Sequence, residues 1–399
     1  EKENIIRLKD TLLEQTVRQL QQKTNELLQN KQAVQDKENK LREYILKERG
    51  LKEDISLKEK ELQSYIQQQK KLKEQIFKMN KTVQRIEAMN SLNLYQKKHV
   101  RDAVTDGCAH AEAIKVLQEK YPSAAATVIM ELTVEAEAFG AEIVFPQHEV
   151  PSVTGRLLTD EAAIESLEVP ALNRGRIAQY LKANMLAAKS IADRPVLAGC
   201  IGPYSLAGRL YDMSEIMMLI YINPDAANTL LRKCSDFITR YCMALKATGV
   251  NGVVMAEPAA GLLSNEDCLQ YSSLFVKEII EKVQDDHFAV VLHNCGNTGN
   301  CTQAMVYTGA AAYHFGNKIK MEEALKEVPA DALAMGNLDP VSLFKMAGPE
   351  SMKEATLQLL ETTRAYPNFV LSSGCDIPPH TSSINIDAFY TALEEFNNG

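Results

Sequence analysis

The sequence of 399 residues contains no tryptophan and no apolar run that approaches the roughly eighteen residues needed to span a bilayer. It has no signal-peptide pattern, and no basic tract dominates any region of a chain with net charge −8 and pI near 5.6. These absences argue against a membrane protein and against nucleic acid as a partner. The eight cysteines are scattered along the chain, which indicates free thiols in a cytoplasm. The chain begins at Glu1 rather than Met, as expected of a fragment or a processed form.

Residues 1–98 lack proline and contain a single glycine, Gly50, while lysine, glutamate and glutamine are abundant. Steps of seven residues meet Ile6, Leu13, Leu20, Leu27, Val34, Leu41, Glu48, Ile55, Leu62, Gln69, Ile76 and Val83. Ten of these twelve residues are apolar, a pattern typical of a coiled coil. We therefore expect residues 1–98 to form a long helix that self-associates, most simply as a parallel dimer.

Residues 99–399 form a second predicted domain, in which short apolar runs alternate with helical stretches such as 225–248 and 265–283. The runs are Ala141–Phe145, Val196–Ile201, Val250–Met255, Ala289–Leu292, Ala310–Phe315, Ala332–Met335 and Phe369–Leu371. Strands that alternate with helices predict a parallel sheet. Seven such units in this α/β domain favour a (β/α)8 barrel of the TIM type over an open sheet.

Two of the runs are followed by soft metal ligands. His293 and Cys295 come directly after one run, and Cys375 follows the last one. Because the carboxyl ends of barrel strands converge on one face, these side chains can meet at one ion. Two thiolates and one neutral imidazole suit zinc and leave its fourth position open for substrate. The alternative is structural, since buried cysteines are often small apolar side chains; Cys301 is a further candidate ligand.

Five more polar side chains follow predicted strands: Tyr204, Glu257, His314, Asn337 and Asp339. Glu257 could accept a substrate proton or complete the metal site, or it could be an ion-paired or capping carboxylate. His314 could act in catalysis by orienting substrate, or it could be a hydrogen-bonded structural histidine. Tyr204, Asn337 and Asp339 are expected to bind substrate, although packing alone would explain Tyr204.

Six segments resemble the uroporphyrinogen decarboxylase superfamily, and within it the zinc-dependent corrinoid methyltransferases. They are Leu132–Gly140, Ile201–Ala207, Ala256–Gly261, His293–Gly296, Gly336–Pro340 and Ser372–Asp376. The resemblance implies a TIM barrel and a zinc site of His293, Cys295 and Cys375, in preference to Cys301. It also implies methyl transfer from a methylated corrinoid such as methylcobalamin, carried by a partner corrinoid protein, to a small-molecule thiol.

Metal-free tetrapyrrole decarboxylation in the same superfamily is an alternative function. That branch uses an Arg-rich N-terminal loop that this chain lacks, and Cys375 stands where it has a histidine. A third hypothesis is a coiled-coil scaffold with an inactive barrel. Relatives of this kind begin with a strand that precedes the segment matching 100–107, and this chain has no convincing counterpart. We therefore predict a barrel without its first strand, open between Ala141–Phe145 and Phe369–Leu371, with recognisable ligands but weak activity.

Overall fold

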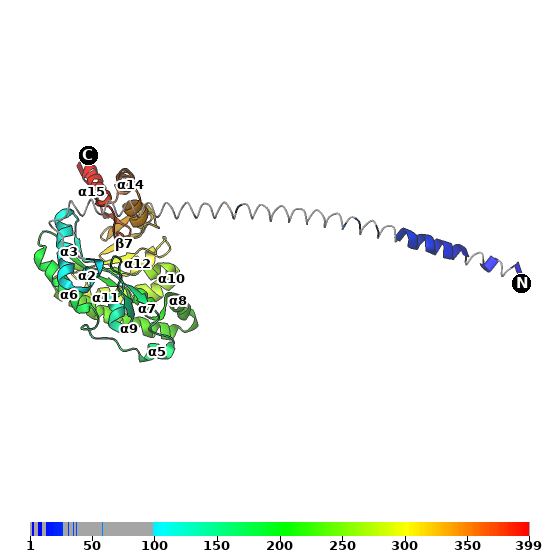
Figure 1. Cartoon of the computed structure of the whole chain (residues 1–399), viewed down its shortest axis with the longest axis horizontal. Helices are drawn as coiled ribbons and strands as arrows, with labels where there is room; N and C mark the ends of the chain where they lie inside the picture. The colour runs from blue at the N-terminus through cyan, green and yellow to red at the C-terminus, as the bar shows by residue number, and fades with distance from the viewer. Residues whose placement is uncertain are drawn as a thin grey trace. The chain divides into compact units, whose positions relative to one another are not determined.

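A computed structural model of the chain describes residues 99–398 without a gap and, before them, residues 2, 3, 7–9, 13–26, 31, 35, 37 and 58 (Figure 1). The chain divides into two units, residues 1–95 and 96–399. In the first unit, the described stretch 13–26 is helical and exposed. Most positions of the predicted coiled coil lie outside the described residues. Across the described part of the chain, no helix is long and apolar enough to cross a membrane.

The second unit is built around a parallel sheet of seven strands. In spatial order these are β1 (Ala126–Thr127), β4 (Val196–Ile201), β5 (Gly252–Ala256), β6 (Ala289–Asn294), β7 (Ala312–Phe315), β8 (Leu333–Leu338) and β9 (Phe369–Ser373). Within residues 99–398, no further strand pairs with the outer edge of β1 or β9. The prediction of a TIM-type barrel that lacks a strand is therefore confirmed. We call the interval between β1 and β9 the open seam.

Helices connect the strands and surround the sheet (Figure 1). They are α2 (Val100–Thr105), α3 (Gly107–Lys120), α4 (Val134–Phe139), α5 (Glu161–Ser166), α6 (Ile177–Ser190), α7 (Pro203–Tyr211), α8 (Met213–Ile222), α9 (Pro224–Ala247), η1 (Pro258–Leu262), α10 (Asn265–Cys268), η2 (Leu269–Ser273), α11 (Leu274–Val283), α12 (Thr302–Tyr307), α13 (Met321–Glu327), η3 (Pro340–Met346), α14 (Pro349–Thr363) and α15 (Ser383–Asn398). The predicted helices 225–248 and 265–283 correspond to α9 and to the run from α10 to α11. Helix α9 begins where Pro224 fixes the backbone and the Asn223 side chain accepts the Ala226 N–H.

The prediction of a barrel strand at Ala141–Phe145 is wrong. Its central residues form β2 (Glu142–Val144), which pairs antiparallel with β3 (Ser152–Thr154) in a separate two-stranded sheet. Glu142 and Val144 are exposed, whereas barrel strands covered by helices need apolar side chains on both faces. The first strand of the sheet is β1, so the open seam lies between β1 and β9 rather than between Ala141–Phe145 and Phe369–Leu371. The two paired residues of β1 give too short a signal to be recognised from sequence.

The outer edge of β1 is covered by a histidine of α3. The N–H groups of Ala126 and Val128 donate to carbonyls beside and within β4. Because N–H groups alternate in direction along a strand, that of Ile129 faces the open seam. It donates to Nε2 of His110 over 2.9 Å. Burial lowers the pKa of His110 to about 4, so the ring is neutral and can accept this bond. The side chain thus satisfies a backbone group that a neighbouring strand would otherwise pair.

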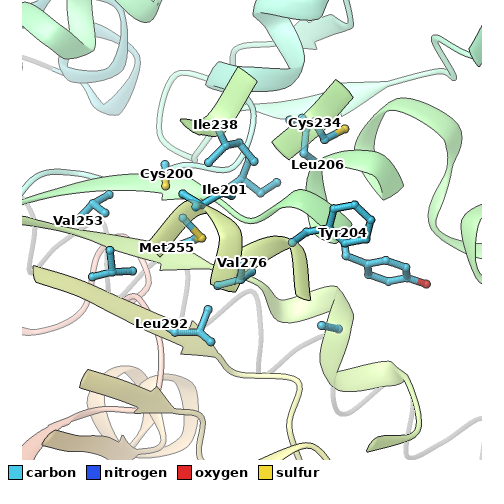
Figure 2. Packing of buried hydrophobic residues seen from close by; sticks show 14 of the residues in the cluster. Cys200, Ile201, Tyr204, Leu206, Cys234, Ile238, Val253, Met255, Val276 and Leu292 are labelled. Atoms are coloured by element: carbon cyan, nitrogen blue, oxygen red, sulfur yellow. The ribbon is translucent and has the colours of Figure 1, made fainter. Parts of the chain in front are cut away.

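The core lies between the sheet and its helices (Figure 2). Cys200 of β4 and Val253 and Met255 of β5 are buried, and so is Ile238 of α9. Strands with both faces covered read as continuous apolar runs, which is why β4 was found from sequence with its bounds unchanged. The core therefore fixes β4, β5 and β6 in the middle of the sheet. Two of the predicted metal ligands depend on β6, because His293 belongs to this strand and Cys295 directly follows it.

Candidate metal site

The three predicted metal ligands lie together. His293 belongs to the carboxyl end of β6, Cys295 follows one residue after β6, and Cys375 lies in the loop after β9. One ligand atom from each residue lies within 4.8 Å of the other two. The Sγ atom of Cys375 is 3.7 Å from Nε2 of His293. His293 is buried and both cysteines are partly exposed, so the sulfur side of the site faces the solvent.

The two thiols of the site have opposite pKa shifts. A hydrogen bond between them lowers the pKa of Cys295 to about 7 and raises the pKa of Cys375. The two sulfur atoms therefore share one proton near neutral pH. A soft divalent cation takes thiolates as ligands and would release that proton. This donor set of two sulfurs and one imidazole nitrogen, open on one side, fits a catalytic zinc ion.

His314 holds the ring of His293. The two residues are register partners on the adjacent strands β7 and β6, so their side chains point to the same face. Nδ1 of His314 is 2.6 Å from Nδ1 of His293, and Nε2 of His314 is 3.1 Å from the Ser372 hydroxyl oxygen. Burial lowers the pKa of His314 to about 3, so this ring is neutral. With His293 donating its Nδ1–H to His314, Nε2 of His293 keeps its lone pair toward Cys375.

Two glycines allow the loops that carry the ligands to approach each other. A Cβ atom at Gly316 would lie 2.6 Å from the Cα atom of Cys295. One at Gly374 would lie 2.6 Å from the backbone nitrogen of Asn317. Both separations are shorter than van der Waals contact. Glycine at these positions is therefore required for Cys295 and Cys375 to come together.

The Glu257 carboxylate lies at the start of α7 rather than among the ligand atoms. Its oxygens accept the backbone N–H groups of Tyr204 at 2.7 Å and Ser205 at 2.9 Å, and the Ser272 hydroxyl at 3.0 Å. Burial raises the pKa of this carboxyl against the lowering effect of these hydrogen bonds. A carboxylate at a helix N-terminus is favoured by the unpaired N–H groups there. The geometry matches the capping alternative more closely than a ligand role.

The three predicted substrate residues make structural contacts within the fold. Tyr204 is fully buried in the core, and its hydroxyl has no hydrogen-bond partner among the described residues (Figure 2). The Asn337 side chain donates to the carbonyls of Gly316 and Ile319. Asp339 caps the start of η3 and accepts a hydrogen bond from Asn317. Asn337 and Asp339 thus fix the loop that follows β7.

Sequence reasoning missed two cations beside the metal ligands. A cavity of about 320 Å³ is lined by Leu132, Ser205, Arg209, Met213, Pro258, Ala259, Leu262, Cys295, Gly296 and Lys318. Arg209 is half-buried and makes no hydrogen bond or ion pair with any described residue, while the nearby Glu131 pairs with Arg176 at 2.5 Å. Lys318 could have been found, because it lies three residues after β7, the strand that carries His314. Arg209 lies inside α7, where no pattern in the sequence marks it.

Cys301 is not part of the metal site. Its side chain is fully buried, and its thiol donates to the carbonyl oxygens of Leu263 at 3.3 Å and Ala260 at 3.6 Å. A larger cavity of about 480 Å³, lined by residues such as Phe139 and Arg174, contains none of the candidate site residues. The chemistry of the described residues is therefore concentrated at His293, Cys295 and Cys375 and in the cavity beside them.

The chain is similar to known proteins with two different activities. A methylcobamide:CoM methyltransferase (MtbA) of Methanosarcina acetivorans is 29% identical over 276 residues, which is 68% of this chain and 80% of that protein. The uroporphyrinogen decarboxylase of Legionella pneumophila (strain Paris) is 23% identical over 70% of this chain and 81% of its own length.

The fold has a counterpart among solved structures. A methyltransferase from Methanosarcina mazei superposes with a TM-score of 0.69 at 25% identity, covering 75% of this chain and 88% of that one. Residues 87–396 match the uroporphyrinogen decarboxylase (URO-D) family. The chain therefore belongs to the uroporphyrinogen decarboxylase family.

Proposed function

We propose that the chain is a zinc-dependent methyltransferase that moves a methyl group from a methylated corrinoid, carried by a partner protein, to a small thiol. The observation that carries the proposal is the convergence of His293, Cys295 and Cys375 within 4.8 Å. Similarity to the methylcobamide:CoM methyltransferases supports the choice of donor and acceptor. The eight free cysteines support a reducing compartment such as the cytoplasm.

Zinc bound by these three residues would supply Lewis acidity that favours the thiolate form of an acceptor thiol. His314 would keep the Nε2 lone pair of His293 directed at the ion through its contact with Nδ1. The acceptor thiol would lose its proton to solvent or to a nearby base. Its sulfur would then form a bond to the methyl carbon as the cobalt–carbon bond of the donor breaks, and the electron pair of that bond would stay with the corrinoid. Glu257 remains a proposal for that base, although its oxygens are engaged by α7 and Ser272.

The cavity beside Cys295 supports an acceptor that carries an acid group. Arg209 is a half-buried guanidinium that makes no hydrogen bond or ion pair with any described residue, and burial lowers its pKa against the raising effect of the nearby Glu131. Lys318 supplies a second positive charge on the same cavity wall. An anion between these groups would relieve the cost of burying an unpaired cation. A short thiol with a terminal acid, such as coenzyme M, matches this arrangement of sulfur-binding and anion-binding groups. Tyr204, Asn337 and Asp339 would shape the site through the loops and helix that they hold.

Zinc content together with methyl transfer tests the proposal. Purified full-length protein is expected to hold one zinc per chain and to demethylate methylcobalamin in the presence of coenzyme M. Cys375→Ser is expected to lose most of the zinc and the activity, whereas Cys301→Ser, which changes a cysteine outside the ligand set, keeps both. Activity is expected to be weak, because Cys375 follows an edge strand and a misplacement of about 1 Å can reduce a rate roughly a hundredfold.

The same measurements separate the alternatives. Protein that binds no zinc but decarboxylates uroporphyrinogen would support the metal-free reaction of the Legionella relatives. Zinc retained by Cys375→Ser at the wild-type level would exclude the ligand set. Zinc binding without methyl transfer to any thiol would favour the coiled-coil scaffold with an inactive barrel.

A further inference from the structure

Three histidines that are not among the metal ligands described above lie close together. His99 precedes α2, His148 lies between β2 and β3, and His380 lies five residues beyond Cys375. The ring centroids of His99 and His148 are 4.8 Å apart, and those of His148 and His380 are 5.8 Å apart. The chain has only seven histidines, and three segments distant in sequence each bring one to this place.

We propose that His99, His148 and His380 form a second site for a divalent transition metal, bound through imidazole nitrogens alone. Two imidazoles that share a tetrahedral ion at a metal–nitrogen distance of about 2.1 Å have ring centroids roughly 5 Å apart. The two centroid separations, 4.8 Å and 5.8 Å, are close to this value. Imidazole suits zinc, nickel, copper and cobalt, so the ligand class is a borderline divalent ion rather than calcium or magnesium.

His99 would exchange its present partners for the ion, and His380 has a backbone conformation found at ligand sites. The amide nitrogen of Gln147 is 2.8 Å from Nε2 of His99, and the His99 side chain also accepts the Asp102 N–H at the start of α2. Metal binding would turn the Gln147 amide so that its oxygen accepts an Nε2–H, which fixes the tautomer in which Nδ1 of His99 is the ligand atom. His380 has φ of 64°, an uncommon conformation for a residue other than glycine. Such backbone conformations cluster at ligand sites.

The three rings need some rotation to meet at one ion. Among the described residues, only His293, Cys295 and Cys375 already have ligand atoms within 4.8 Å of one another. The side chains of His148 and His380 are exposed, so rotation about their own bonds is open to them. Binding would join the start of α2, the β2–β3 sheet and the loop after Cys375. None of the three histidines is a ligand of the first site, so this proposal does not rest on the proposed methyl transfer.

Cobalt titration of the metal-free full-length protein distinguishes the two sites. Thiolate ligands give cobalt a charge-transfer absorption in the near ultraviolet, whereas an all-imidazole site gives only weak visible bands. The wild type is expected to bind two cobalt ions per chain, one with and one without the thiolate absorption. Residues 1–98 contain no histidine or cysteine, so they add no comparable ligands.

His148→Ala and His380→Ala are each expected to weaken the second ion at least about tenfold while the thiolate absorption stays at one equivalent. His287→Ala removes another exposed histidine and is expected to keep both ions. Binding of a single cobalt by the wild type, or an unchanged second ion in both variants, would overturn the proposal. The metal site of the proposed function is tested separately by the same spectra. If that site does not bind metal, the wild type shows no thiolate absorption, whether or not the second ion binds.

Discussion

Nδ1 of His314 lies 2.6 Å from Nδ1 of His293, and this contact decides which nitrogen of His293 is available to a metal. Because burial keeps His314 neutral, one ring must donate and the other accept. In the tautomer that carries its hydrogen on Nε2, His314 donates to the Ser372 hydroxyl oxygen and accepts at Nδ1 from His293. His314 is then a positioning residue that acts through His293.

Replacing His314 by alanine is expected to weaken zinc binding by about 10- to 100-fold, because His293 loses the partner that orients its ring. Competition with a chromogenic chelator measures this affinity directly. His314→Gln, whose amide oxygen can accept the same hydrogen bond, is expected to recover part of the loss. His287→Ala is the control. Equal affinities in the wild type and His314→Ala would show that the contact has no effect on the metal.

Arg209→Met is expected to raise the KM for coenzyme M by roughly tenfold or more, because hydrogen bonds to charged groups are worth about 1.5–3 kcal/mol. The KM for a neutral thiol such as 2-mercaptoethanol is expected to stay unchanged. Arg232→Met, which removes an exposed arginine of α9, controls for the loss of net charge. A parallel rise in KM for both thiols would mean that Arg209 shapes the cavity rather than binding an anion.

Stability is expected to depend on pH through Glu135, a buried carboxyl of α4. Burial raises its pKa from 4.5 to about 7, although Oε1 accepts the Ile201 N–H, and Oε2 has no hydrogen-bond partner among the described residues. A carboxyl whose pKa is higher in the folded state contributes its full stability below pH 4.5. It loses that contribution as the pH rises to about 7.

Glu135→Gln cannot ionise, so it is expected to be more stable than the wild type at pH 8 by roughly 3 kcal/mol, at 1.36 kcal/mol per pKa unit. At pH 4.5 the two proteins are expected to differ little. Urea unfolding at both pH values gives the comparison. The same stability difference at both pH values would contradict a raised pKa at this position.

Self-association through the N-terminal unit is the fourth prediction. Leu13 and Leu20 are 64% and 60% exposed in the single chain, although both belong to the predicted apolar stripe. Burying such side chains in a dimer is favoured by roughly 25 cal/mol per Å². Deleting residues 1–90 is expected to convert a dimer into a monomer in sedimentation at micromolar concentration.

Substitutions within the helix test the same interface without a deletion. The double variant Leu13→Glu, Leu20→Glu is expected to have a sedimentation coefficient closer to that of the monomer. Glutamate at Gln15 and Gln22, on other positions of the same helix, adds the same charge and is expected to leave the dimer intact. A wild-type chain that sediments as a monomer and does not change on deletion would rule out the dimer.

The sequence predicts most of the sheet and the metal ligands because both depend on local patterns. Buried runs such as Val196–Ile201 mark strands, and ligands at the carboxyl ends of parallel strands must meet. The Ala141–Phe145 run fails because five residues of a barrel strand and of a surface hairpin have similar composition, and only burial separates them. The contact of His314 with His293 depends on the register of β6 against β7. Arg209 makes no ion pair with any described residue because Glu131 pairs with Arg176 instead. Neither relationship is contained in the spacing of residues.

The open seam also has a kinetic consequence. Strand β9 has a neighbour on one side only, and all five of its residues are partly exposed, so it is the part of the sheet most prone to opening by itself. Cys375 follows this strand, while His293 and Cys295 are attached to β6 in the middle of the sheet. Each opening of β9 would withdraw one ligand from the other two without unfolding the rest of the domain. Metal release and hydrogen exchange of the β9 amides would then report one and the same motion, and a bound ion would slow both in proportion.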